Sequence, residues 1–488
     1  MIAIITSVII LLTPIQASAV TWGEIVTGLQ ASDTFKAGET EAARTGNGEY
    51  VISGGQIEDL VEVNDLQFSD SLKVLFRNIG ITQLNAHADN GKTIVVILGS
   101  GSEVEDSVRV FAEGKDTNLS LTNEGKMGYL GVNAHHQAQA TIKNNGEITR
   151  GMNNTAYGEG SRLEFVNDKE GRITGGMHNN AVEKGELAFT NNGTISGEDL
   201  FNGASNGGVL KNTNNGTINA TNDLHNLAAD GGFVESTNNG TINGGVMNQA
   251  NKEGSRNAAT NNGTVNGRYE FYTEGGEEVV GENNGTVNSL YAGADGGRVS
   301  AVNNGKVKEE IRADASHESM KADVTVINNG EADRMYVSAG ENGMLNVENN
   351  GRLTGDGKTR ITIEWEGGEI SKELSGELGI DAWDKGATVN VTNNGSAAAA
   401  YIGAADGANA SLKNDGQIGN GEGVPLNSYA AEDGRLMVTG SGSLEPYTLK
   451  MEDGTERTVS MIAQFGGNPS VEEIRQRVGE MVQFDSPG

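Results

Sequence analysis

The chain has 488 residues, among them 71 Gly, 5 Pro and no Cys, and its formal net charge is −31. The lack of Cys excludes disulfide bonds, thiolate metal sites and a Cys nucleophile. Asp and Glu (66) outnumber Lys and Arg (35), and this acidic balance argues against non-specific binding of nucleic acid because the field repels phosphate.

Residues 1–19 have the pattern of an export signal. An apolar run from Ile2 to Leu12 is followed by Ala17-Ser18-Ala19, a small-residue cleavage pattern. We therefore expect a signal peptide, a mature chain beginning at Val20, a secreted or surface-displayed protein, and no transmembrane span once the signal is removed. The alternative for this run is a buried strand or helix.

Residues 20–48 precede the repeats and are predicted to cap them. Trp22, Ile25, Val26 and Leu29 follow i, i+3, i+4, i+7 spacing, which predicts a short amphipathic helix. A stack of strands needs such a cap, because a bare strand edge would recruit other chains.

Residues 49–445 are internally repetitive. The string Asn-Asn-Gly-Thr-Ile/Val recurs every 20 to 25 residues, and its copies begin at Asn191, Asn214, Asn238, Asn261 and Asn283. Asn-Gly between two β-prone runs is a turn signal, and helical periodicity of adequate length is missing. Each unit is predicted to be a strand, an Asn-Gly turn, a strand, a short corner, a strand and a Gly turn.

A second pattern has the same period: an apolar residue followed four positions later by Ala, as in Leu200 to Ala204 and Leu224 to Ala228. In a strand these two positions share a face, which we take as the inward face. In five units the inward residue between them is Asn, and stacked Asn side chains can bond one another. The predicted structural ladder contains these residues and the second Asn of each turn: Asn154, Asn179, Asn202, Asn226 and Asn248, with Asn192, Asn215, Asn239, Asn262 and Asn284.

These patterns predict an all-β fold: a single-stranded parallel β-helix, or β-solenoid, of about 15–18 coils of 22–23 residues with short helical caps. Over residues 49–445 the chain resembles the right-handed parallel β-helix proteins that bacteria secrete or display, such as adhesins and autotransporter passengers, and pectate-lyase-like proteins. The resemblance implies right-handed winding and a bacterial source, but no particular activity.

Residues 446–488 are predicted to be a C-terminal cap or linker. Ser470 is an expected N-cap with a capping box, and the residues that follow it contain one apolar helical face.

Candidate binding residues lie one position after the inward apolar residue, where the side chain faces outward. From Met177 onward this outward column contains rings that could stack on sugar rings. The candidates are Tyr291, Tyr336, Tyr401 and Tyr429, with Trp365 and Trp383 from the irregular segment 352–390. The alternative is ordinary packing between neighbouring strands.

The predicted function is a non-catalytic structural or adhesive protein with a repetitive face for glycans or for host or cell-surface proteins. We expect no cofactor, no metal, no nucleic-acid partner and no assigned catalytic residue. The alternative is an extracellular polysaccharide lyase or glycoside hydrolase, for which Glu366, Asp381 and Asp384 are the best-placed acidic residues. End-to-end assembly of rods is a third possibility, and the oligomeric state is left open.

Overall fold

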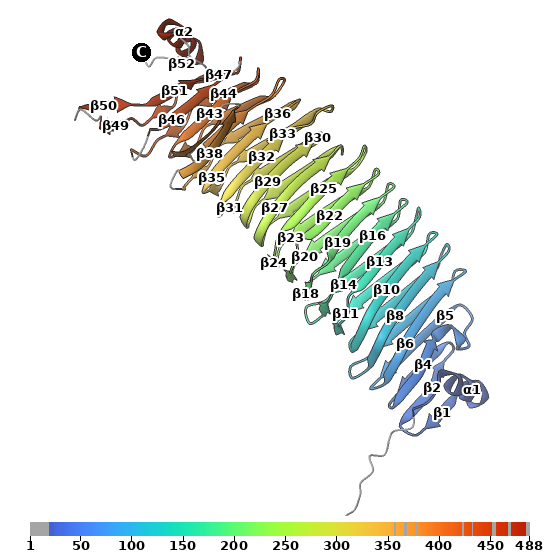
Figure 1. Ribbon diagram of the computed structural model, residues 1–488. Coiled ribbons are helices and arrows are strands. Elements are labelled where there is room, and N and C mark those ends of the chain that lie inside the picture. Colours follow the sequence, from blue (N-terminus) through green and yellow to red (C-terminus); the bar gives the residue numbers. More distant parts are fainter. Residues whose placement is uncertain are drawn as a thin grey trace, which may run out of the picture.

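The computed structural model describes residues 19–355, 358–365, 368–375, 378–421, 424–431, 433–450, 455–466 and 470–484. Residues 1–18 of the predicted signal peptide lie outside these ranges. The chain forms an elongated rod of stacked β-strands with about 16 turns (Figure 1). The predicted parallel β-solenoid is therefore confirmed.

Each regular coil contributes a strand to each of three faces of the rod. The first face contains the long strands β4 (Gln56–Glu62), β6 (Gly80–Asp89), β8 (Glu103–Glu113), β10 (Lys126–His135), β13 (Met152–Tyr157), β16 (Met177–Val182), β19 (Leu200–Ser205), β22 (Leu224–Ala229), β25 (Val246–Asn251), β27 (Thr264–Glu274), β29 (Thr286–Asp295), β32 (Glu310–Ala315), β35 (Arg334–Ala339), β40 (Leu378–Ala382), β43 (Ala400–Ala404), β46 (Leu426–Ala430) and β51 (Met461–Phe465). Six of them, β4, β6, β8, β10, β27 and β29, begin on the third face and continue around a bend into the first.

The second face ends, in most coils, at the first Asn of the turn motif. Its strands are β3 (Glu49–Ser53), β5 (Ser71–Arg77), β7 (Thr93–Leu98), β9 (Asn118–Asn123), β11 (Gln139–Asn144), β14 (Arg162–Asn167), β17 (Glu186–Asn191), β20 (Val209–Asn214), β23 (Phe233–Asn238), β26 (Arg256–Asn261), β28 (Glu278–Asn283), β30 (Gly297–Asn303), β33 (Ala322–Asn328), β36 (Gly343–Asn349), β41 (Thr388–Asn393), β44 (Asn409–Asn414), β47 (Arg435–Gly440) and β52 (Val482–Phe484).

The third face contains short strands that follow the Asn-Gly turn. They are β12 (Glu147–Ile148), β15 (Arg172–Thr174), β18 (Thr194–Gly197), β21 (Thr217–Ala220), β24 (Thr241–Asn243), β31 (Lys306–Val307), β34 (Glu331–Ala332), β37 (Arg352–Leu353), β42 (Ser396–Ala397), β45 (Gln417–Ile418) and β48 (Ser443–Leu444). Pairing between successive coils on all three faces is parallel and in register.

The core is a set of columns of identical or similar inward side chains. On the first face, the apolar residue and the Ala that were predicted inward are buried in each of the coils of β13 to β25, as in Leu224 and Ala228. The third face adds a buried Ile or Val from each short strand, as in Ile195 and Ile218. Since equivalent residues meet one coil apart, the periodicity of the sequence becomes a continuous apolar core.

Two asparagine ladders run inside the rod. The predicted one joins Asn154 to Asn248 through amide hydrogen bonds of 2.8–2.9 Å. The second is formed by the first Asn of the turn motif, from Asn123 to Asn414, with Nδ2 to Oδ1 distances of 2.7–2.8 Å. The predicted second Asn of the turn also forms a ladder, as in Asn215 to Asn192 at 2.9 Å, but this ladder lies on the surface. The prediction therefore missed the buried ladder one residue earlier.

The N-terminal end is closed by a helix and an antiparallel hairpin. α1 (Trp22–Ser32) has Thr21 as its N-cap and buries Trp22, Ile25 and Leu29, as its spacing predicts. β1 (Thr34–Ala37) and β2 (Thr40–Gly46) pair antiparallel with each other, and β2 pairs with β3.

The C-terminal end is arranged differently. α2 (Val471–Met481) starts at Ser470 with the predicted capping box, and β52 adds a last strand to the second face. The coils continue past residue 445, because β51 pairs with β46 on the first face. Two hairpins leave the stack: β38 (Lys358–Trp365) with β39 (Gly368–Ser375), inside the predicted irregular segment, and β49 (Tyr447–Lys450) with β50 (Glu456–Val459).

Candidate binding face

Two neighbouring columns of outward side chains on the first face contain most of the candidate residues. Column A contains Glu62, Asn85, Arg109, Gly131, Asn153, His178, Phe201, His225, Met247, Glu270, Tyr291, Arg312, Tyr336, Gly379, Tyr401 and Asn427. Column B lies two residues further along each strand and includes His87, Phe111, Asn133, Thr155, Asn180, Gly203, Leu227, Gln249, Tyr272, Gly293, Asp314, Ser338, Asp381, Gly403 and Tyr429.

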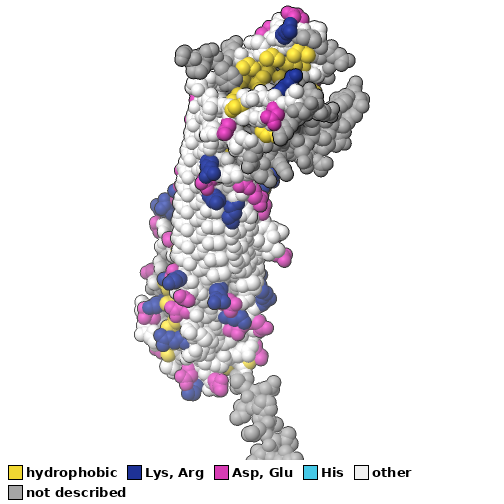
Figure 2. Space-filling model, turned by 90° about the vertical axis from the view of Figure 1, so that its left-hand side faces the viewer, with side chains coloured by type: hydrophobic (Ala, Val, Ile, Leu, Met, Phe, Trp, Pro, Cys, Tyr) yellow, Lys and Arg dark blue, Asp and Glu magenta, His cyan; other side chains and the backbone are white. Residues whose placement is uncertain are grey.

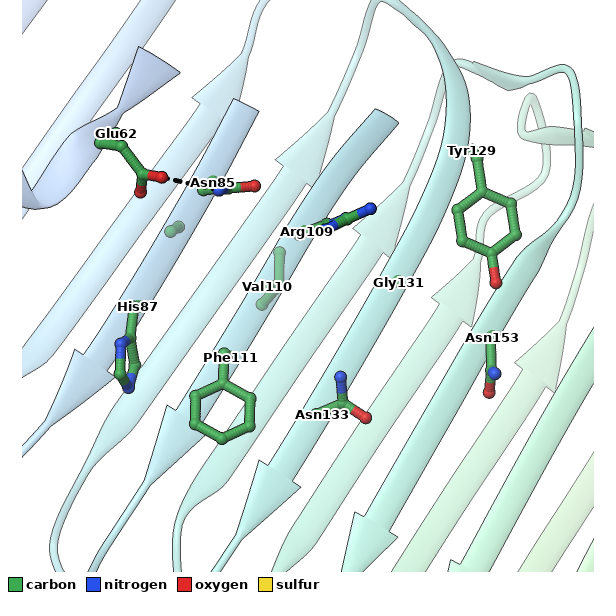
Figure 3. A pocket seen from close by; sticks show the side chains of 11 residues that line it. Glu62, Asn85, His87, Arg109, Val110, Phe111, Tyr129, Gly131, Asn133 and Asn153 are labelled. Carbon is green, nitrogen blue, oxygen red and sulfur yellow. Dashed lines mark hydrogen bonds between the residues drawn. The ribbon is translucent and has the colours of Figure 1, made fainter. Parts of the chain in front are cut away.

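A hollow of about 570 Å³ lies on the coils of β4 to β13 (Figure 3). Asn85 Nδ2 donates to Glu62 at 2.8 Å on one side of it. Arg109 projects from the next strand, is exposed, and makes no ion pair with any described residue. Tyr129, 37% exposed, stands at the opposite side. The hollow thus offers a free guanidinium, an amide and an aromatic face.

Rings follow one another up this part of the rod. The ring centroids of His87 and Phe111 are 4.8 Å apart, those of Phe111 and His135 5.1 Å, and those of His135 and Tyr157 5.3 Å. Burial lowers the pKa of His135, and the neighbouring His136 contributes in the same direction. A neutral His ring packed between aromatic rings gives this row an apolar character at neutral pH.

A second hollow, of about 850 Å³, continues the first along the rod. Tyr129 and Asn153 line both, so the two form one groove between the first and third faces. Ser196 and Asn219 line it from the third face and His178 from the first. Phe201 follows His178 in column A, and their ring centroids are 6.0 Å apart. We call the surface formed by these two hollows the groove.

A third hollow, of about 410 Å³, lies further along the same face and has a different chemistry. The guanidinium of Arg268 lies 4.0 Å from the ring centroid of Tyr291, and Arg312 pairs with Asp314 at 2.8 Å. Burial raises the pKa of Glu270, while Arg268 opposes the shift. These charges compensate one another, so the hollow is polar without a strong net field.

The predicted row of exposed tyrosines is only partly present. Tyr291 and Tyr336 are half-buried in column A, whereas Tyr401 is buried, with 4% of its surface exposed. A methyl group on Gly403 would lie 2.6 Å from the Tyr401 hydroxyl, which shows that this ring lies flat over the glycine. The prediction of an exposed ring at Tyr401 was wrong, because column B offers a small residue for the ring to cover.

Tyr336 and Tyr401 surround a carboxyl group in column B. The Tyr336 hydroxyl donates to Asp381 Oδ2 at 2.9 Å, and Tyr401 also hydrogen-bonds to this carboxyl. Burial raises the pKa of Asp381 to about 6, although both tyrosines oppose the shift. A carboxyl that titrates near neutrality can exchange a proton, but the Asp381 carboxyl already accepts hydrogen bonds from the two tyrosines.

The other three predicted residues are separate from this cluster. Tyr429 pairs with Gly403 and so belongs to column B; Asn427 takes the position in column A that was expected for Tyr429. Trp383 is 48% exposed and donates from Nε1 to Ser338 Oγ at 3.0 Å. Trp365 ends β38, and its side chain, like the whole of Glu366, lies outside the described residues.

The groove residues Arg109, Tyr129 and Asn153 were missed by the sequence analysis, which began the outward column at His178. The signal was present, since Leu84 to Ala88 and Leu130 to Ala134 continue the same inward pattern upstream. Applying the rule one residue after Leu84 identifies Asn85, and the same rule after Met152 identifies Asn153.

In the ranges that the structure describes, no three His, Asp or Glu side chains are grouped so as to hold a metal ion. No helix in these ranges has the length and apolar content needed to cross a bilayer. Comparison with known proteins finds no family model, curated protein or solved structure that matches the chain. The class that the structure itself defines is a parallel β-solenoid with internal asparagine ladders.

Proposed function

We propose that the protein is a non-catalytic, secreted or cell-surface β-solenoid, structural and adhesive in role, whose groove binds an extended glycan chain. The observation that carries the proposal is the adjoining pair of hollows, which run along the rod axis and share Tyr129 and Asn153. A polymer lying along this axis meets side chains from several successive coils, which rise about 4.8 Å each.

The residue types of the groove favour a carbohydrate. Half-exposed rings such as Phe111 offer flat apolar faces for sugar rings, and amides such as Asn153 donate to and accept from hydroxyl groups. The groove also carries both acidic and basic groups, among them Arg150 and Asp199. This balance favours a neutral chain over a strongly charged one.

Binding of the mature chain to an array of immobilised glycans tests the proposal. Tyr129→Ala and Phe111→Ala are each expected to reduce retention about tenfold, because each removes a ring that lines the groove. Phe233→Ala is the matched control: Phe233 is also a half-buried outward ring, but on the second face. Equal retention of all three variants, or retention of proteins rather than glycans, would contradict glycan binding in the groove.

The same incubation separates a binder from an enzyme. A polysaccharide lyase or glycoside hydrolase would release new chain ends from the bound glycan, with Asp381 as the carboxyl best able to exchange a proton. Release of such ends that Asp381→Asn abolishes would replace adhesion by catalysis. Retention without new ends is the outcome expected here.

A further inference from the structure

The third face carries one column of outward residues that stays in register from Gln56 to Ser443, and its central twelve coils have a distinct charge pattern. In stacking order the column, which we call the strip, contains Glu103, Lys126, Glu147, Arg172, Thr194, Thr217, Thr241, Thr264, Thr286, Lys306, Glu331 and Arg352. Charged residues of alternating sign thus flank five consecutive threonines. Figure 2 shows an uncharged stretch of this kind in the middle of the rod, with Lys, Arg, Asp and Glu toward both ends.

The centre of the strip is uncharged and lies between two ladders of asparagine side chains. The surface ladder through Asn215 borders it on one side, and a further ladder, Asn219 to Asn243 to Asn266 at 2.8 Å, borders it on the other. The five threonine hydroxyls have no hydrogen-bond partner among the described residues. This regular row of hydroxyls between hydrogen-bonded amides can form hydrogen bonds with another molecule. Ordering these short side chains on binding costs little side-chain entropy.

The charged ends of the strip are also largely unpaired. Lys126 and Glu103 form an ion pair at 2.8 Å. Within the described part of the chain the remaining charges of the strip make no ion pair: Glu147, Arg172, Lys306, Glu331 and Arg352. Four basic and three acidic residues nearly cancel, so the strip is close to neutral on a chain whose net charge is −31.

From this pattern we infer that the strip is a self-association surface, on which two copies of the chain pack side by side and antiparallel. Pairing about a two-fold axis between the coils of Thr217 and Thr241 places these two threonines opposite each other. Lys306 then faces Glu147 of the second copy, Glu331 faces Lys126, and Arg352 faces Glu103. Each contact occurs twice because the axis is two-fold, so three opposite-charge pairs become six.

The alternating signs disfavour two other arrangements of a two-fold dimer. Parallel packing in register sets each residue against its own copy, so that Lys306 meets Lys306. An antiparallel pair centred on Thr241 sets Lys306 against Arg172 and Glu331 against Glu147, which are like-charge contacts. Electrostatics thus favours the antiparallel register between Thr217 and Thr241 over these two, since like charges placed opposite each other are unfavourable.

The size of the strip fits a dimer. Twelve coils at about 4.8 Å each, and three columns about 7 Å apart, give roughly 800 Å² per copy. This is the area of a standard specific interface, so no additional contact is required. The strip borders the groove through Ser196 and Asn219, and a second copy would therefore form one rim of it.

Charge reversal with rescue tests the inference in the mature chain. By sedimentation velocity we expect a dimer at low salt that weakens as salt rises, because screening reduces the six contacts. Lys306→Glu and Glu147→Lys should each raise the dimer Kd about tenfold, and the double variant should restore it. Rescue can only arise between chains, since the two positions lie seven coils apart, roughly 34 Å. Lys115→Glu, at an exposed turn residue without an ion pair among the described residues, is the control.

Cross-linking identifies the register. The chain has no Cys, so introduced thiols are the only ones. Under oxidation a mixture of Lys306→Cys and Glu147→Cys chains should form a covalent dimer, while each variant alone should stay monomeric on a denaturing gel. Covalent dimers from Lys306→Cys alone would show parallel packing, and a monomer at every concentration would refute self-association. Circular dichroism of each variant separates a lost interface from a lost fold.

Discussion

At the scale of single residues, the buried asparagines show how this rod places amides in its interior. Asn202 Oδ1 accepts from Asn179, and Asn202 Nδ2 donates to Asn226, so each amide is satisfied by the coils before and after it. The ladder stops where its neighbours change: Val132 precedes Asn154, and Phe271 follows Asn248. Asn154 Oδ1 is correspondingly left without a partner.

Phe271 ends the ladder without overcrowding the core. A methyl group on Gly281 would lie 2.2 Å from this ring, so the glycine across the core makes the space that the larger side chain needs. The exchange of Asn for Phe is therefore coupled to a Gly on the second face.

Asn202→Ala is expected to destabilise its coil by roughly 2–4 kcal/mol, because it leaves one buried donor and one buried acceptor unpaired. The control is Asn215→Ala in the surface ladder, where water replaces the lost partners and the cost stays below about 1 kcal/mol. Amide hydrogen exchange measures the free energy of local opening for both. Equal costs at the two positions would contradict the distinction between buried and surface ladders.

At the scale of elements, three neighbouring strands of the first face, β35, β40 and β43, hold the Asp381 carboxyl between two tyrosines. Because its folded pKa of about 6 lies above the ordinary value for Asp, the folded state binds the proton more tightly than the unfolded state. The stabilisation of the folded state by the protonated Asp381 carboxyl is therefore complete at pH values below about 4, and it is lost as the pH rises through 6.

Asp381→Asn should remove this pH dependence, since an amide stays neutral and still accepts a hydrogen bond. We expect the stability of the variant, relative to that of the unmodified chain, to be greater at pH 7.5 than at pH 4.5. Thermal unfolding of both proteins at the two pH values measures this difference. Asp406→Asn, in an exposed turn after β43, should show no such difference. A gain that is the same at both pH values would mean that the Asp381 carboxyl is not the titrating group.

The sequence predicts which elements form better than it predicts which side chains are exposed. The recurrence of Asn-Asn-Gly fixes the coil length, but both asparagines satisfy the same pattern, and only the bend of the backbone decides that Asn191 points inward and Asn192 outward. Tyr401 shows the same limit: its outward position follows from the period, yet its burial depends on Gly403 and Asp381 from neighbouring positions. Tyr429 was assigned to column A but lies two residues further along its strand, in column B, because Asn427 holds the column A position.

At the scale of the whole molecule, the rod is a one-dimensional stack in which each coil contacts only its neighbours. Stability is then a sum of coil and interface contributions, and the two ends are the places where strand edges need protection. α1 and the β1–β2 hairpin protect one end. At the other end β52 adds a strand beside β47, and the described side chains of α2 are mostly exposed. The rod sides remain free for contacts with other molecules, as both the groove and the strip require.

The length of the rod makes the proposed dimer distinguishable by its shape. About 16 turns at roughly 4.8 Å give a rod of roughly 75–80 Å before the caps are added. The two-fold axis proposed for the strip lies close to the middle of the stack, so that two antiparallel copies would end nearly flush. Small-angle scattering should therefore give twice the monomer mass with almost the same maximum dimension and a larger cross-section. Joining the rods end to end would instead nearly double the maximum dimension, and Lys306→Glu would then leave the profile unchanged.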